Sequence, residues 1–409
     1  MQKLEELIQK LCPNGVEYKK ICEVTNILRG KRLTKSQLLE DGLYPVYHGS
    51  LSPLGYYNKA NRESDTVIVV NTGGIGGVGY SAAPFWCSDG CFCIEHCKIL
   101  INKFIYYFLV GFQDYFVSRI RTGGVPTIDK DTVGNIKIPI PPIEVQEEIV
   151  RILDKFTELT AELTAELTAR KKQYEFYRDQ LLSFNSINDT TNNRTGGGYN
   201  HLLNCQVKWV RLGDLALVTK LAGFEFTKYV KYSNSGQIIA LRGLNVKNGQ
   251  LDLTDVKYID ESDLSKLDRS KLKKGDLLFT YVGTVGQVAL INEDEKFYLA
   301  PNVALIRITN EGVLPDYLRY YCQSNIFYKK EILRLIQASS MQNIPMEKIR
   351  KFVVPVPPIE EQKRIVAILD RFDKLCNDIS EGLPAEIEAR QKQYEYYRDK
   401  LLTFEEIAQ

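Results

Sequence analysis

The chain has 409 residues, of which 44% are hydrophobic and 25% charged, and its net charge is only +2. This length predicts two or three domains, and the composition is that of a folded globular protein rather than a disordered or fibrous one. The longest apolar run, 104–112, is far shorter than the roughly 20 residues of a membrane span, and nine cysteines without framework spacing are typical of a reducing cytoplasm.

The first predicted element is a short helix over residues 1–12 (MQKLEELIQKLC), which is too charged for a signal peptide. Residues 67–80 (VIVVNTGGIGGVGY) then predict a strand, a glycine turn and a second strand. The glycine spacing resembles a dinucleotide-binding loop, but Pro84 and the clustered aromatics that follow cannot start the helix that such a loop needs. We therefore expect a glycine-rich hairpin here and in the similar segment 277–288 (LLFTYVGTVGQV).

Four cysteines between positions 87 and 97 lie close to His96, and two of their spacings are compatible with a zinc site. However, Cys91 and Cys93 alternate along a probable strand, and the matching segment 297–308 (FYLAPNVALIRI) contains no cysteine. We expect buried, reduced cysteines here and no metal site.

A long helical segment follows over 138–184. It starts at a proline pair in IPIPPIEVQEEIVRILDKF and ends in RKKQYEFYRDQLLSF. Its apolar residues recur in steps of three and four, which predicts a coiled-coil seam. The tetrad ELTA occurs three times over 158–169, and its glutamates are interpreted as a solvated face rather than a catalytic array. As a helix, 144–184 would be about 60 Å long.

The polar segment 185–200 (NSINDTTNNRTGGGYN) predicts a flexible linker, and after it the chain repeats itself. Residues 354–372 (VPVPPIEEQKRIVAILDRF) match 138–156, and 390–404 (RQKQYEYYRDKLLTF) match 170–184. Residues 16–24 and 207–215 are related more faintly. In the second copy, Gly382 and Pro384 predict a helix break near Leu383.

These patterns predict an α+β chain with an internal repeat in five segments. The segments are a globular domain at 1–137, a helical segment at 138–184, the linker at 185–200, a second globular domain at 201–353, and a second helical segment at 354–409.

The positive charge lies in the two globular domains, where phosphate contacts with DNA are expected. Residues 1–137 carry a net charge of +3 and 200–353 a net charge of +6, whereas the remainder is negative. Basic and amide residues cluster in glycine-containing or small-residue loops. The candidate DNA-contacting residues are Arg29, Lys31, Arg32, Arg119, Arg121, Thr122, Arg242, Asn245, Lys273, Lys274, Gln342 and Asn343.

No catalytic residues are predicted, because the chain contains no P-loop, HExxH, GxSxG or Asn-Pro-Pro-aromatic sequence. Two alternatives to a DNA-binding adaptor are a self-contained DNA methyltransferase and a coiled-coil scaffold without a DNA role. The absence of these catalytic motifs disfavours the methyltransferase, and the concentration of positive charge in the two globular domains disfavours the scaffold.

Two variable domains alternating with two nearly identical helical phrases resemble the specificity (S) subunit of type I restriction–modification enzymes. This resemblance implies that each domain is a target-recognition domain for one half of a bipartite, asymmetric DNA site. The helices would pair as an antiparallel coiled coil in a pseudo-twofold arrangement, set the gap between the half-sites, and dock two methylase (M) subunits. The N-terminal helix would pack beside the C-terminal one.

The resemblance also implies the partners: double-stranded DNA, two M subunits and restriction (R) subunits, in the cytoplasm and without a membrane role. S-adenosylmethionine, ATP and Mg²⁺ would belong to those subunits and no cofactor to this chain. The residues predicted to form the spacer or dock partners are Ile149, Leu153, Phe156, Leu159, Leu163, Leu167, Tyr174, Tyr177, Ile365, Leu369, Phe372, Tyr394 and Tyr397.

Overall fold

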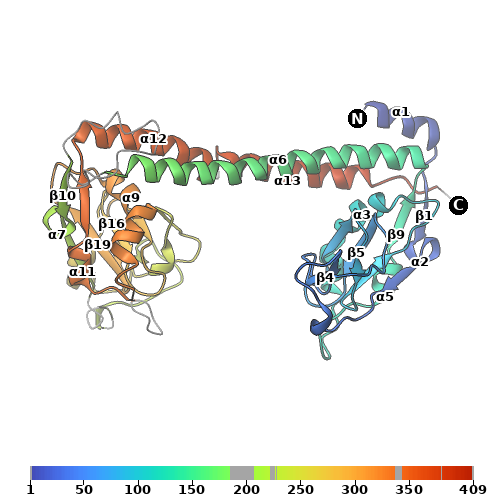
Figure 1. Cartoon of the computed structure of the whole chain (residues 1–409), viewed down its shortest axis with the longest axis horizontal. Coiled ribbons are helices and arrows are strands. Elements are labelled where there is room, and N and C mark those ends of the chain that lie inside the picture. Colours follow the sequence, from blue (N-terminus) through green and yellow to red (C-terminus); the bar gives the residue numbers. More distant parts are fainter. Residues whose placement is uncertain are drawn as a thin grey trace. The chain divides into compact units, whose positions relative to one another are not determined.

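The computed structural model describes residues 2–184, 207–221, 226, 228–336, 343–378 and 380–407. They form two compact units: unit 1 comprises Met1–Ala165 with Ala385–Gln409, and unit 2 comprises Glu166–Pro384. Figure 1 labels many of their elements. The predicted linker, 185–200, lies outside the described residues.

Unit 1 is built around an antiparallel sheet in the order β2 (Ile27–Arg29), β8 (Cys91–Ile94), β5 (Thr66–Val70), β6 (Val78–Ser81). A second sheet has the order β4 (Gly55–Tyr57), β3 (Tyr44–Tyr47), β7 (Trp86–Cys87), and β1 (Glu17–Lys20) pairs with β9 (Lys137–Ile140). Strand β5 is buried along its whole length because its sequence, TVIVV, is apolar on both faces. Val67 and Val69 join the main core of unit 1, whereas Ile68 and Val70 join a smaller cluster with the β-strand cysteines.

The helices of unit 1 cover this core. Besides parts of the long helices described below, they are α1 (Gln2–Leu11), α2 (Ile21–Val24), α3 (Asn102–Val110), α4 (Gln113–Ser118) and α5 (Lys130–Gly134), with a 3₁₀ turn at Lys35–Gln37. The predicted N-terminal helix is confirmed as α1, which buries Leu4. Helix α3 buries Phe104 and Phe108 in the same core as Val67 and Val69. None of the helices within the described ranges is long and apolar enough to cross a membrane.

Unit 2 repeats this plan. Its main sheet has the order β11 (Ala216–Lys220), β19 (Val303–Ile308), β16 (Leu277–Thr280), β17 (Val288–Leu290), and the second has the order β15 (Lys257–Tyr258), β12 (Ile239–Leu241), β18 (Phe297–Leu299). β10 (Lys208–Arg211) pairs with β20 (Val353–Val356), and β13 (Val246–Lys247) with β14 (Gln250–Leu251).

Besides part of the long helix described below, the helices that the structure describes in unit 2 are α7 (Leu212–Leu215), α9 (Pro315–Gln323), α10 (Asn325–Phe327), α11 (Met346–Arg350) and α12 (Ile359–Asn377). Short 3₁₀ turns lie at Gly243–Asn245, Leu264–Lys266 and Asp268–Ser270, and a π-helical turn at Tyr328–Ile332. The mixed helices and strands and the two repeated domains confirm the main features of the predicted fold class.

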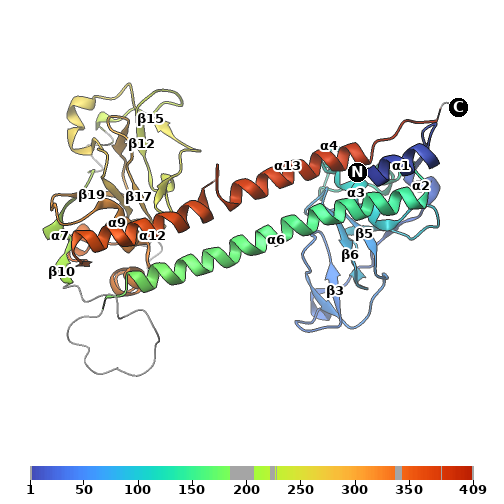
Figure 2. The same cartoon turned by 90° about the horizontal axis from the view of Figure 1, so that it is seen from above.

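Each compact unit contains parts of both helical segments. Helix α6 (Ile143–Leu181) starts directly after the predicted proline pair and contributes residues up to Ala165 to unit 1 and the rest to unit 2. In unit 1 it packs on α13 (Leu383–Leu401), where Phe156 stacks on Tyr397 at 5.4 Å; in unit 2 it packs on α12, where Tyr177 stacks on Phe372 at 5.8 Å. Figure 2 shows these helices from above. Each unit therefore joins the first half of one helical copy to the second half of the other.

The second helical copy is interrupted as predicted, since α12 ends at Asn377 and α13 starts at Leu383. A Cβ on Gly382 would lie 2.6 Å from the carbonyl oxygens of Lys374 and Asp378, so the turn requires glycine. The carboxylate of Asp378 accepts hydrogen bonds from the backbone N–H groups of Ser380 and Glu381, which precede α13.

A buried glutamine joins each helical segment to its globular domain. The side-chain carbonyl of Gln146 accepts from the N–H of Ile101 (2.8 Å), and its amide donates to the carbonyls of Ile99 and Pro141. Gln362 makes the same three bonds in unit 2, with the N–H of Leu314 and the carbonyls of Gly312 and Pro357. Both side chains are fully buried. The glutamine that both PPIExQ phrases share thus clasps the helical segment to the globular domain in each unit.

A tyrosine–aspartate hydrogen bond reinforces each clasp. Tyr107 of α3 donates to Asp154 of α6 (2.5 Å), and Tyr320 of α9 donates to Asp370 of α12 (2.7 Å). The two domains therefore attach to their helices in the same way.

Both chain ends lie in unit 1. The N–H of Val16 donates to the carbonyl of Glu405, and the N–H of Ile407 donates to the carbonyl of Val16. Leu4 shares the core of unit 1 with Leu401 and Leu402. The end of the C-terminal helix and the N-terminal helix thus belong to one core.

Candidate nucleic-acid interface

Each main sheet ends in a glycine turn, residues 71–77 between β5 and β6 and residues 281–287 between β16 and β17. We call the end of the sheet that carries this turn the turn end of each unit. Gly73 and Gly76 have φ values of 79° and 90°, and Gly283 and Gly286 have 77° and 93°. Such backbone angles favour glycine, and each turn leads into a strand. The predicted glycine-rich hairpins are confirmed, and neither opens the helix that a dinucleotide loop requires.

The turn end of unit 1 is closed by backbone contacts between glycines. The N–H of Gly74 donates to the carbonyl of Gly49 at 2.8 Å, and a Cβ on Gly73 would lie 2.8 Å from that carbonyl oxygen. Beside them, His48 Nδ1 lies 3.3 Å from the carboxylate of Asp89. Arg29 Nε lies 3.4 Å from the Asp89 carbonyl. These contacts hold the segments around Gly49 and Asp89 close to the glycine turn.

Two of the predicted basic loops lie at the turn end of unit 1. Thr127 pairs with Thr72 of the glycine turn, so the loop that carries Arg119, Arg121 and Thr122 returns to it. All three of those side chains are exposed; Arg121 pairs with Asp129, and Arg119 lies over the Tyr115 ring.

The segment Arg29–Arg32 runs beside the same edge, because the N–H of Lys31 donates to the carbonyl of Cys87. Arg29, Lys31 and Arg32 are all exposed. Unit 1 thus gathers exposed cations from two separate segments at its turn end.

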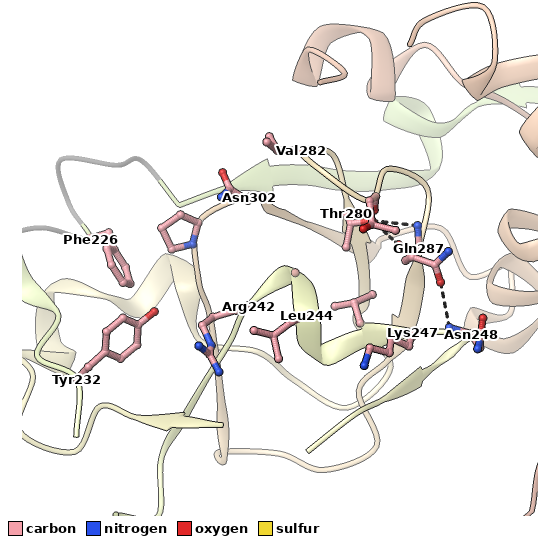
Figure 3. Close-up of a pocket in the computed structure, with 14 residues that line it drawn as sticks. Phe226, Tyr232, Arg242, Leu244, Lys247, Asn248, Thr280, Val282, Gln287 and Asn302 are labelled. Atoms are coloured by element: carbon pink, nitrogen blue, oxygen red, sulfur yellow. Dashed lines mark hydrogen bonds between the residues drawn. The ribbon is translucent and has the colours of Figure 1, made fainter. Parts of the chain in front are cut away.

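The turn end of unit 2 is hollow (Figure 3). A cavity of about 730 Å³ is lined by Phe226, Tyr232, Arg242, Gly243, Leu244, Val246, Lys247, Asn248, Thr280, Val282, Thr284, Gln287, Pro301 and Asn302. The rings of Phe226 and Tyr232 lie 5.3 Å apart on one side, and the side chains of Thr280 and Gln287 lie on the other. This cavity offers apolar and aromatic surface beside amide and hydroxyl groups, which are the groups that contact base edges.

Hydrogen bonds hold the polar side of the cavity in place. Thr280 Oγ1 accepts from the N–H of Gln287 (2.9 Å), and Gln287 Oε1 accepts from the N–H of Asn248 (3.2 Å). One Nη atom of Arg242 forms an ion pair with the carboxylate of Asp255 at 2.9 Å. The Nε atom of Arg242 is buried without a hydrogen-bond partner.

The two turn ends correspond position by position. The strand pairings make His48 equivalent to Arg242, and Thr127 equivalent to Asn343, which pairs with Val282 as Thr127 does with Thr72. Thr127 and Asn343 therefore occupy equivalent positions beside the glycine turns of the two repeats.

Lys220 is a basic residue that our sequence analysis missed. It is equivalent to Arg29, because both end the strand that pairs with β8 or β19. Its Nζ lies 5.4 Å from the centre of the Tyr281 ring, and its side chain is exposed. Extending the match between 16–24 and 207–215 by five residues would have found it.

Three predicted contacts do not fit this arrangement. Asn245 is fully buried, and its amide donates to the carbonyls of Asp252 and Asp255 at 2.8 Å, so in this conformation it fixes its own loop and does not present its amide at the surface. Lys273 and Lys274 are exposed but precede β16, at the other end of the hairpin from its glycine turn. Gln342 lies outside the described residues, whereas its neighbour Asn343 is exposed.

Several residues predicted to form the spacer or dock partners are internal. Ile149, Leu153, Ile365 and Leu369 are fully buried in the cores of their own units, so in this structure they pack within the chain. Phe156, Tyr177, Phe372 and Tyr397 form the stacked pairs described above, and Tyr174 also stacks on Phe372, at 6.2 Å. Leu159, Leu163 and Leu167 are half-buried, as is Tyr394, whose ring lies 6.4 Å from that of Tyr107. These residues hold the helices together or to the domains.

The strand cysteines of unit 1 are packing residues. Cys87, Cys91 and Cys93 are fully buried in a cluster with Phe85, and no disulfide joins them. Burial raises the pKa of the Cys91 thiol to about 12, which disfavours the thiolate that zinc requires. Among the residues that the structure describes, no three His, Cys, Asp or Glu side chains are placed to hold a metal ion.

Comparison with known proteins gives a consistent result. A family model described as the type I restriction modification DNA specificity domain matches residues 13–170 and 205–389. A putative type I restriction enzyme specificity subunit from Haemophilus influenzae is 31% identical over 416 aligned positions, which cover 98% of each chain. The specificity subunit of the type I restriction enzymes EcoR124I and EcoR124II from Escherichia coli is 35% identical over 321 positions, covering 74% of this chain and 70% of that protein.

Solved structures share the fold. The S subunit of a type I restriction–modification system from M. genitalium superposes with a TM-score of 0.56 at 16% identity, covering 95% of this chain and 96% of that one. A chain from a structural study of complex assembly in a type I restriction–modification system gives a TM-score of 0.60 at 18% identity, covering 95% and 98%.

Proposed function

This chain belongs to the family of type I restriction–modification DNA specificity proteins, and we propose that its two units recognise the two halves of a bipartite, asymmetric DNA site. Residues 1–137 and 201–353 act as target-recognition domains. Residues 138–184 and 354–409 act as the helical spacer, an antiparallel coiled coil in which Leu159, Leu163 and Leu167 belong to the seam.

One observation carries this proposal: two domains with different loop sequences place basic residues at equivalent positions of the same edge. Arg29 corresponds to Lys220 at the turn ends of the two units. Cations at such an edge would position DNA through its phosphates, and the differing loops would contact the bases. The different side chains at the two turn ends, including those that line the unit 2 cavity, suit the recognition of two different half-sites.

The chain acts as a non-catalytic adaptor in this proposal. Two M subunits dock on the duplicated helices and bring S-adenosylmethionine for adenine methylation, and R subunits bring the ATP- and Mg²⁺-dependent activities. The complex works in the cytoplasm. The two helical copies explain how one polypeptide offers equivalent sites to two identical partners.

The proposal is tested by mapping adenine methylation across a genome that expresses this chain with its M subunits. Thr122→Ala in unit 1 should relax one half of the methylated motif, and Asn343→Ala in unit 2 should relax only the other half. Lys274→Gln serves as a control at the far end of the unit 2 hairpin. A wild-type chain that supports no bipartite motif, or a single substitution that alters both half-sites, would contradict the proposal.

A further inference from the structure

Two aromatic side chains of the helical segments point away from every core. In the described part of the chain, Phe176 and Tyr396 are the aromatic residues with more than half of their surface exposed, at 58% and 62%. They lie 220 positions apart, in QYEFYRD of the first helical copy and QYEYYRD of the second. The two most exposed rings therefore occupy the same position of the repeat, one in each unit.

The other aromatic and basic residues of this phrase are used internally. In unit 2, Tyr174 is 5% exposed, Tyr177 stacks on Phe372, and Arg178 lies over the Tyr174 ring at 5.4 Å. In unit 1, Tyr397 stacks on Phe156, and Arg398 lies over the Tyr394 ring at 5.9 Å. Helix packing thus explains every ring of the phrase except the one that faces outward.

The surroundings of the two exposed rings also match. Each follows a glutamate, Glu175 or Glu395, and lies one turn after a lysine, Lys172 or Lys392. These four side chains are exposed. Single exposed apolar residues are common on soluble proteins, but a duplicated exposed ring with duplicated charges indicates two copies of one docking site.

From this placement we propose that Phe176 and Tyr396 are the central anchors for two copies of one partner, which is the M subunit if the proposed function holds. Each copy offers an apolar socket for the ring. Because one site has phenylalanine and the other tyrosine, the socket recognises the ring and does not need the hydroxyl group. Aromatic side chains at the centre of an interface commonly dominate its affinity.

The experiment measures how many M subunits bind the full-length chain, by native mass spectrometry and by titration. The wild type should bind two. Phe176→Ala and Tyr396→Ala should each weaken one site at least tenfold and leave a complex with a single M subunit, and the double variant should lose both. Phe176→Tyr and Tyr396→Phe should still bind two.

Glu162→Ala, an exposed change on the same helix outside the phrase, is the matched control and should bind two M subunits. Thermal unfolding of each variant should match the wild type, because the rings lie outside the cores. If both alanine variants bind two M subunits with wild-type affinity, the inference is wrong while the proposed function stands. If the wild type binds no M subunit, the proposed function itself fails.

A second copy of this chain is the competing occupant. Sedimentation of the wild type without M subunits distinguishes the two, since a dimer that Phe176→Ala converts to monomer would overturn the assignment to a partner.

Discussion

At the scale of single residues, Gln146 and Gln362 show how a repeated sequence encodes a repeated junction. Each amide satisfies one N–H group and two carbonyls where the helical segment leaves the globular domain. Buried backbone groups without partners are costly, so the glutamine is needed wherever this junction is built. Its conservation between the copies follows from backbone chemistry rather than from DNA recognition.

We expect Gln146→Ala and Gln362→Ala each to lower the free energy of unfolding of their unit by about 2–4 kcal/mol, because three buried groups lose their partner. Urea denaturation monitored by circular dichroism would measure this. Gln180→Ala, an exposed position of α6, should change stability by less than about 0.5 kcal/mol. Equal effects at all three positions would show that the clasp contributes nothing specific.

Glu148 is the second residue whose environment predicts a measurable effect. Its carboxylate is 3% exposed and lies 2.6 Å from Arg151 and 2.8 Å from Lys3 of α1. Hydrogen bonds from Arg151, and then from Lys3, lower the pKa of Glu148 from 4.5 to about 2. A lowered carboxyl pKa stabilises the fold above the unfolded pKa and loses that contribution as the pH falls.

Glu148→Gln should therefore destabilise unit 1 by about 1–3 kcal/mol at neutral pH. The difference from the wild type should shrink as the pH falls from about 4.5 toward about 2, the interval between the two pKa values. Thermal unfolding of both proteins across this range measures it, with the exposed neighbour change Glu147→Gln as control. A difference that stays constant with pH would refute the pairing.

At the scale of elements, the two helical copies differ in the middle of the repeat. Helix α6 is continuous through the ELTA tetrads, whereas the second copy has the Gly382 turn at the corresponding place. The side chains of Leu159, Leu163 and Leu167 recur every four residues, so a tetrad is a unit that α6 can gain or lose without changing its local pattern. Four helical residues correspond to about 6 Å, or one to two base-pair steps.

Deleting Thr160–Leu163 should therefore shorten the unmethylated gap in the recognised motif and leave both half-sites unchanged. Methylation mapping of the deletion variant tests this. A substitution within the tetrad that keeps its length, such as Glu162→Gln, is the control and should preserve the gap. An unchanged gap in the deletion variant would show that the length of this segment does not set the distance between the half-sites.

Local sequence patterns predicted which elements form, but they did not predict which distant residues pack against those elements. The proline pairs, the Gly382 break and the glycine hairpins depend on neighbouring residues, and all were predictable. The position of Lys220 beside Tyr281 depends on β11 pairing with β19 across more than eighty residues, which no local pattern encodes. Likewise, Ile149 and Leu153 have the spacing of a seam, but the sequence could not show that their own domain covers them.

At the scale of the whole molecule, the charge distribution predicts how binding depends on salt. Arg29 and Lys220 occupy equivalent exposed positions in the two units. A side chain that neutralises one phosphate releases about one counterion, and its loss changes the slope of log K against log salt by about 0.9.

Arg29→Gln and Lys220→Gln should each reduce that slope by about 0.9 in the complex with M subunits, measured by fluorescence anisotropy between low and physiological salt. Lys274→Gln, at the other end of the unit 2 hairpin, should leave the slope unchanged. If Lys274→Gln has the full effect and Lys220→Gln has none, the turn end is not the DNA-binding edge of unit 2.

Each unit contains helical residues from both copies, and this suggests how the chain evolved. A polypeptide with one recognition domain and one helical copy would lack the helix that completes its own unit. Two such polypeptides would each supply that helix to the other and close into a homodimer with twofold symmetry, and its target would be a palindrome. Tandem duplication and fusion of such a gene would free the two halves to diverge. The present chain carries both repeats in one polypeptide, and each unit contains helical residues from both copies. Under the proposed function, such a fusion would let one protein recognise two different DNA sequences.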